Sequence, residues 1–140
     1  MRITDSLISA RFLSTFGHIT ALLILFQTIQ NNVEKSTADN ATADVKASML
    51  SDARGCLIFG CFCFLCDLSG LFFGHSIFIP GMNLAHVFFH AVGSILLSWV
   101  ITENWYVSTL WPIVLCTNMP TAILELGILF GIYVLKVVAR

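Results

Sequence analysis

The chain has 140 residues, of which 57% are hydrophobic and only 11% are charged, and its mean hydropathy is +0.88. Charged residues make up about a quarter of an ordinary soluble domain, so the composition excludes a soluble protein and indicates an integral membrane protein. The net charge of −1 offers no basic surface to nucleic acid, and the five cysteines all lie in apolar segments and predict no disulfide framework.

The first apolar segment covers residues 12–29 and is long enough to cross a bilayer as a helix. It ends in Gln27-Thr28-Ile29-Gln30, without the small residues of a signal-peptide cleavage site. We therefore expect a retained membrane anchor, with Arg11 and His18 on one face because they are seven residues apart.

Residues 30–54 form the long polar region of the chain. Its first half predicts a flexible loop, and from about Thr42 onward its alanine-rich sequence is able to extend the second helix beyond the membrane surface. Asn40-Ala41-Thr42 is an N-glycosylation sequon, which is usable only if this loop faces the lumen.

The second predicted helix, residues 55–79, has a face of small and polar side chains. Its members follow one another at spacings of three and four, which stacks them along one helical face: Cys56, Gly60, Cys63, Asp67, Gly70 and Gly74. Small residues allow a neighbouring helix in a membrane to approach closely. Asp67 lies near the middle of this face, where an unpaired carboxylate is costly, so it needs a partner.

Pro80-Gly81 predicts a short turn, which makes helices two and three an antiparallel hairpin. The third helix is expected at residues 82–101, with Asn83, His86 and His90 on one face.

The fourth helix is expected at residues 107–135, after an aromatic turn at Trp105-Tyr106 that suits the membrane interface. One side of it carries Trp111, Asn118, Thr121 and Glu125. Pro120 removes a backbone donor and predicts a kink.

These elements predict an all-α fold, an integral membrane four-helix bundle made of two antiparallel hairpins, with one domain over residues 1–140. Four spans place both termini on the same side. The tails carry four basic residues and the first loop three, and together with the Asn40 sequon this favours cytosolic termini.

Four buried polar groups, one on each helix, are expected between the cytosolic face and the middle of the bilayer: His18, Asp67, His90 and Glu125. One interpretation is that they are interhelical hydrogen-bonding groups that fix the register of the bundle. Glu125 is then protonated or paired, with His18 and His90 as the nearest candidates in depth.

Two other interpretations remain open. His86 and His90, with His18 opposite, are candidate axial ligands of haem, and Asp67 with Glu125 are candidates for carrying protons or ions. Cys61-x-Cys63-x-x-Cys66 has no second cluster to complete a zinc site. We expect no catalytic residues, no metal and no cofactor.

The chain resembles a known family through residues spread over nearly its whole length outside the first loop: Arg11-Phe12-Leu13, His18, Leu25-Phe26, Asp67, Gly70, Gly74-x-Ser76-x-Phe78, His90, Leu97-Ser98, Glu103-x-Trp105, Trp111, Pro120 and Glu125. In their order and spacing these residues are similar to the transmembrane protein 107 family of four-span membrane proteins. Asp67 stands where that family tends to have glutamate, and Lys136 and Arg140 replace a lysine cluster.

The resemblance implies a non-enzymatic scaffold in the membrane of the ciliary transition zone. Family members help to assemble the Meckel syndrome module with tectonic proteins, B9-domain proteins and other membrane proteins, and so influence ciliary membrane composition and ciliogenesis. By this resemblance the partners are lipids and transition-zone proteins. The residues expected to pack helices or contact partners are Gly60, Asp67, Gly70, Gly74, His18, His90, Trp111, Pro120 and Glu125.

Overall fold

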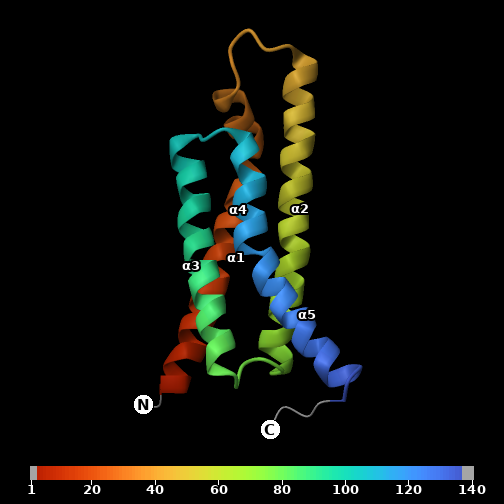
Figure 1. Cartoon of the computed structure of the whole chain (residues 1–140). Helices are drawn as coiled ribbons and strands as arrows, with labels where there is room; N and C mark the ends of the chain where they lie inside the picture. The colour runs from red at the N-terminus through yellow and green to blue at the C-terminus, as the bar shows by residue number, and fades with distance from the viewer. Residues whose placement is uncertain (1–2, 137–140) are drawn as a thin grey trace.

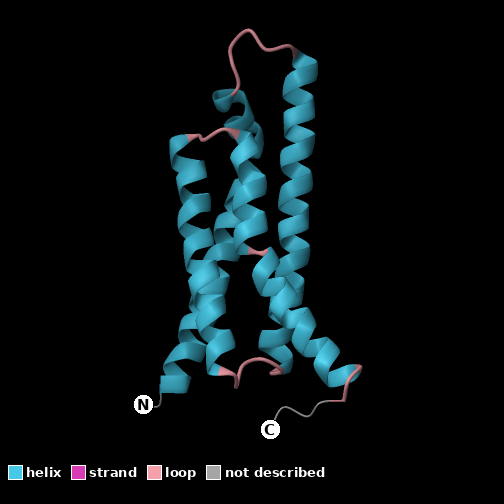
Figure 2. Cartoon of the chain, in the orientation of Figure 1, coloured by secondary structure: helices cyan, strands magenta, loops and turns pink. Residues whose placement is uncertain are grey.

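The computed structural model describes residues 3–136, and this part of the chain is helical with short connections (Figure 1, Figure 2). The elements are α1 (Ile3–Ser36), α2 (Ala43–Phe73), α3 (Pro80–Glu103), the 3₁₀ turn η1 (Val107–Thr109), α4 (Leu110–Thr117) and α5 (Met119–Tyr133). Four stretches are long and apolar enough to cross a membrane: Asp5–Ser36, Ala43–Phe73, Pro80–Glu103 and Val107–Tyr133. The predicted all-α, four-span fold is therefore confirmed.

The fourth span is broken at Asn118, between α4 and α5 (Figure 2). Pro120 is the second residue of α5 and has no N–H, so the carbonyl of Cys116 loses its helical partner. The axis of α5 turns away from that of α4 at this point (Figure 1). The kink expected near Pro120 is present.

The polar region 30–54 is more helical than expected. α1 continues to Ser36 and α2 begins at Ala43, so the connection is residues 37–42. The extension of α1 packs Val33 into the apolar core, and the buried Asn32 donates a hydrogen bond to the Val100 carbonyl at 3.4 Å. Tertiary packing thus overrides the weak helix propensity of this polar sequence.

α2 ends at Phe73, six residues before the predicted end, because Gly74 adopts the left-handed conformation with φ of 75°. Glycine is the residue that takes this conformation without steric cost, and it caps the helix here. Gly74 is therefore a helix terminator and not part of the helical packing face on which the sequence pattern placed it.

The helices form a four-sided bundle in the order α1, α2, α4–α5, α3. α1 packs most extensively against α3, and α2 and α3 make no direct backbone contact in the described chain. They lie on opposite sides of the bundle in Figure 1. The prediction that helices two and three pack as a hairpin is therefore wrong, because residues 74–79 connect them across a diagonal.

The interior is divided along its length. At the end that holds residues 37–42 the core is apolar and includes Leu22, Leu25, Leu57, Leu97, Leu110 and Val114. At the end where α1 begins and α5 ends, buried side chains are mainly polar, and they include Arg11, His18, Asp67, Asn83, His86, His90 and Glu125. Large apolar side chains such as Phe62, Leu65 and Phe88 point outward, as lipid contact requires.

Candidate functional site: a buried polar network

A buried ion pair crosses one diagonal of the bundle. Arg11 on α1 donates from Nη2 to Glu125 Oε1 on α5 at 2.5 Å, and both side chains are at most 1% exposed. α1 and α5 make no direct backbone contact in the described chain, so the long arginine side chain spans the centre. The pair has hydrogen-bonding support, which a buried ion pair needs in order to offset desolvation.

Ser76 in the α2–α3 connection and Asn83 in the first turn of α3 provide that support. Arg11 Nη1 donates to Ser76 Oγ at 2.9 Å and to Asn83 Oδ1 at 3.0 Å. Ser76 Oγ donates in turn to Glu125 Oε1 at 2.5 Å, and Asn83 Nδ2 donates to the Ile77 carbonyl at 2.6 Å. The ion pair therefore fixes the position of the connection as well as two helices.

Three imidazoles continue the network towards the middle of the bundle. His86 Nε2 lies 3.1 Å from Glu125 Oε1, and His86 Nδ1 lies 3.4 Å from His90 Nε2. His90 Nδ1 lies 3.1 Å from His18 Nδ1 on α1. Phe64 stacks on His90 and meets His18 edge-on, so it closes the polar region against the apolar core.

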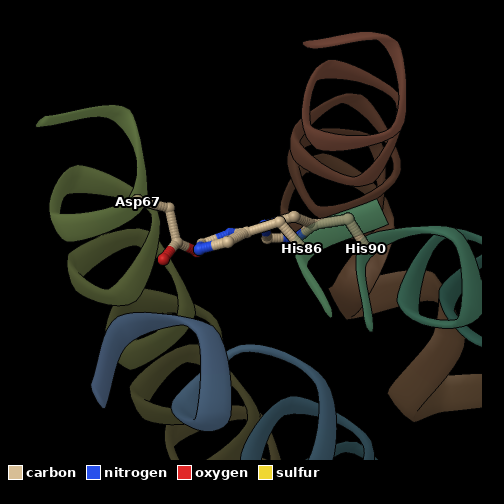
Figure 3. A group of neighbouring side chains, drawn as sticks. All are labelled: Asp67, His86 and His90. Carbon is tan, nitrogen blue, oxygen red and sulfur yellow. The ribbon is translucent and has the colours of Figure 1, made fainter. Parts of the chain in front are cut away.

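Asp67 extends the network across the second diagonal, from α2 to α3. Its Oδ2 lies 3.4 Å from His90 Nε2 and accepts a hydrogen bond from Thr121 Oγ1 at 2.9 Å. Figure 3 shows the two α3 imidazoles directed at this carboxylate across the space between the helices. Each pair of opposite helices is thus joined through buried side chains.

Two glycines make room for the network. A Cβ atom on Gly70 would overlap the Glu125 carboxylate, and a Cβ atom on Gly93 would overlap the His18 ring. At Gly60 the nearest atom to such a Cβ is Leu22 Cδ1 at 2.7 Å, in the apolar half. Gly60 and Gly70 therefore lie where α2 packs closely against its neighbours.

The remaining predicted residues lie outside the network. Trp111 is half-buried, and its indole N–H donates to both carboxylate oxygens of Asp52 at 3.1 Å. Pro120 sets the break between α4 and α5. Asn40 is exposed in the connection 37–42.

The sequence pattern brought His18, Asp67, His90 and Glu125 together but assigned Glu125 the wrong partners. Glu125 contacts Arg11, Ser76 and His86 rather than His18 or His90. The seven-residue spacing correctly places Arg11 on one face with His18, and this shared face is the signal that points Arg11 into the bundle. Its pairing with Glu125 is not predicted by the spacing.

The network geometry gives no support to the haem interpretation. His18 and His90 are in direct contact, with 3.1 Å between their Nδ1 atoms, which leaves no space for a porphyrin between two axial ligands. Transport across the membrane is likewise unsupported, because Asn32 is the one buried polar side chain of the described chain on the far side of the apolar core.

Comparison with known proteins identifies the family. The family model of transmembrane protein 107, described as a transmembrane protein, matches residues 7–129. The chain belongs to the transmembrane protein 107 family. Transmembrane protein 107 of Rattus norvegicus is 28% identical over 135 residues, and those of Mus musculus and Homo sapiens are 27% and 26% identical. Each alignment covers 94% of both chains, and no solved structure matches.

Membership of the transmembrane protein 107 family agrees with the four apolar spans. The names of these relatives describe membrane proteins and state no enzymatic activity. In the described residues the polar network is buried and its hydrogen bonds join helices of the same chain, while some of its polar atoms, such as Asp67 Oδ1 and Glu125 Oε2, have no hydrogen-bond partner.

Proposed function

We propose that this protein is a non-enzymatic membrane scaffold of the ciliary transition zone. In this proposal it helps to assemble the Meckel syndrome module with tectonic and B9-domain proteins, and thereby controls ciliary membrane composition and ciliogenesis. The observation that supports it most is membership of the transmembrane protein 107 family over residues 7–129.

The structure supports a scaffold in physical terms. Its buried charged groups hold helices to one another, and it offers neighbours an outer surface of apolar side chains with short connections at each end. A membrane protein of this kind contacts partners through its helix faces, since the bilayer provides little hydrophobic force between helices and close packing must supply the affinity.

The orientation is part of the proposal. We place both termini in the cytosol and residues 37–42 in the lumen or outside the cell. The start of α1 and the end of α5 lie at the same end of the bundle, and the Asn40 sequon is exposed at the other (Figure 1).

The test is rescue of ciliated cells that lack their own family member. We expect the tagged chain to concentrate at the cilium base and to restore tectonic and B9-domain proteins there. A signal spread evenly over the endoplasmic reticulum, with tectonic proteins still missing from the cilium base, would contradict the proposal. Equal expression of tagged chain in rescued and control cells excludes a simple abundance effect.

A further inference from the structure

We propose that Asp67, His86 and His90 form a binding site for one transition-metal ion of the zinc class in the core of the bundle. Each residue offers one ligand atom, these atoms lie within 4.8 Å of one another, and all three side chains are buried. The site is independent of the proposed scaffold function, and it uses residues from two helices that do not touch through their backbones.

The spacing of the ligand atoms fits a small ion. His90 Nε2 lies 3.4 Å from Asp67 Oδ2 and 3.4 Å from His86 Nδ1. Zinc binds nitrogen and oxygen at about 2.0–2.2 Å, which places two ligand atoms of a tetrahedron roughly 3.3–3.5 Å apart. Two of the three ligand-to-ligand distances therefore already have the value that a tetrahedral ion requires.

The surrounding residues orient both imidazoles for metal binding. His86 Nε2 lies 3.1 Å from Glu125 Oε1 without a hydrogen bond to it, and a proton on that nitrogen leaves the lone pair on Nδ1 for an ion. His90 Nδ1 faces His18 Nδ1 at 3.1 Å, and an N–H donated there leaves the lone pair on His90 Nε2. Metal-binding histidines in proteins are oriented in this way by a partner on the second ring nitrogen.

A bound ion would take the place of the protons between these groups. Asp67 Oδ2, His90 Nε2 and His86 Nδ1 would then each direct a lone pair at it, and the proton of the His86–His90 hydrogen bond would be released. Thr121 Oγ1 donates to Asp67 Oδ2 and holds the carboxylate in place. Figure 3 shows the imidazoles directed at it.

The unbonded carboxyl oxygen of Asp67 is the second, independent observation. Arg11 is bonded to Glu125, and the ion-pair partner that the described chain offers Asp67 is the His90 imidazole. Asp67 is 1% exposed, and its Oδ1 has no hydrogen-bond partner. A buried carboxyl group with one oxygen unbonded and an imidazole as its charged neighbour carries a desolvation cost when it is ionised, and a bound cation offsets that cost.

The ligand set selects the class of metal. Two imidazole nitrogens with one carboxylate oxygen suit zinc and cobalt, whereas calcium and magnesium prefer oxygen ligands throughout. Three protein ligands leave the fourth position of a tetrahedron for water. The ion would join α2 to α3 across the diagonal.

The experiment uses the full chain, purified in lipid nanodiscs with an affinity tag that contains no histidine, treated with a chelator and then titrated with Co²⁺ as a spectroscopic probe. We expect one equivalent to bind with the visible absorption of tetrahedral cobalt, and Zn²⁺ to displace it. Asp67→Asn and His90→Gln should each weaken binding at least tenfold. His75→Gln, which removes a histidine outside the network, should leave binding unchanged.

Three results would overturn the proposal. They are absence of stoichiometric cobalt binding by the folded wild-type chain, binding that survives in both Asp67→Asn and His90→Gln, and binding that His75→Gln abolishes. If the network variants fail to fold, thermal unfolding of the wild-type chain decides. A rise in melting temperature with Zn²⁺ that is absent with Mg²⁺ supports the site, and equal melting temperatures with the two ions refute it.

Discussion

Removing the charge of Glu125 while keeping its shape is the most direct test of the diagonal ion pair. In Glu125→Gln the amide oxygen can still accept hydrogen bonds from Arg11 and Ser76, but the guanidinium keeps its charge in a site that is 1% exposed. Removing one partner of a buried pair costs about 3–5 kcal/mol of unfolding free energy. Because the glutamine retains hydrogen bonds, we expect a loss near the lower end, about 3 kcal/mol.

Arg11→Gln removes the other partner and leaves the Glu125 carboxylate with Ser76 and His86. We expect this variant to lose about 3–5 kcal/mol, because three hydrogen bonds of the guanidinium disappear with the charge. The double variant leaves no unpaired charge of this pair, so its loss should be about 1–3 kcal/mol smaller than the sum of the two single losses.

The assay is equilibrium unfolding of the four proteins in mixed micelles, followed by the loss of tertiary packing as denaturing detergent is added. Glu103→Gln is the matched control, because it makes the same chemical change at an exposed position and should stay within about 0.5 kcal/mol of wild type. Single variants that both lose less than about 1 kcal/mol, or a double variant whose loss is the plain sum, would refute the ion pair's structural role.

Three further predictions concern packing, capping and orientation. Gly70→Ala should lower the unfolding free energy by about 1–3 kcal/mol in the same assay, because the added Cβ overlaps the Glu125 carboxylate. Gly127→Ala is the control, because the space around Gly127 is open and the variant should not be destabilised. Equal losses in the two variants would contradict the packing of Gly70. Gly74→Ala should cost about 1–2 kcal/mol because of its φ of 75°, and an unchanged stability would show that the cap is not strained by a side chain. If residues 37–42 are lumenal, cells should add a glycan to Asn40, and the Asn40→Gln variant should lack it, which a gel mobility shift detects. Cleavage of residues 37–42 by protease added outside sealed microsomes, whose cytosolic face is outward, would reverse the orientation.

The sequence predicted the four spans and the faces that carry the polar groups. Heptad-like spacing placed His18, Asp67, His90 and Glu125 on inward faces because helical geometry alone relates spacing to a face. The break near Pro120 followed from a missing backbone donor, which is also a local property.

The order of helices around the bundle could not be predicted in this way. Spacing gives the inward face of each helix, but it does not say which helix lies opposite, so the Arg11–Glu125 diagonal was missed. Ser76 lies in the connection, which has no periodicity to read. The end of α2 depends on the left-handed conformation of Gly74, and nothing in the apolar run before it distinguishes this glycine from the packed Gly70.

The central claim is that the protein acts through the outer faces of its assembled helices, and that the buried charges of Arg11 and Glu125 contribute to stability and not directly to function. The measurement is the amount of tectonic protein at the cilium base in cells that lack their own family member and express the Arg11→Gln, Glu125→Gln double variant at wild-type abundance. If the protein is a scaffold, the folded double variant should restore tectonic protein to the wild-type level. A double variant that folds normally and restores none would show that the Arg11 and Glu125 charges act directly in function, and would contradict the account.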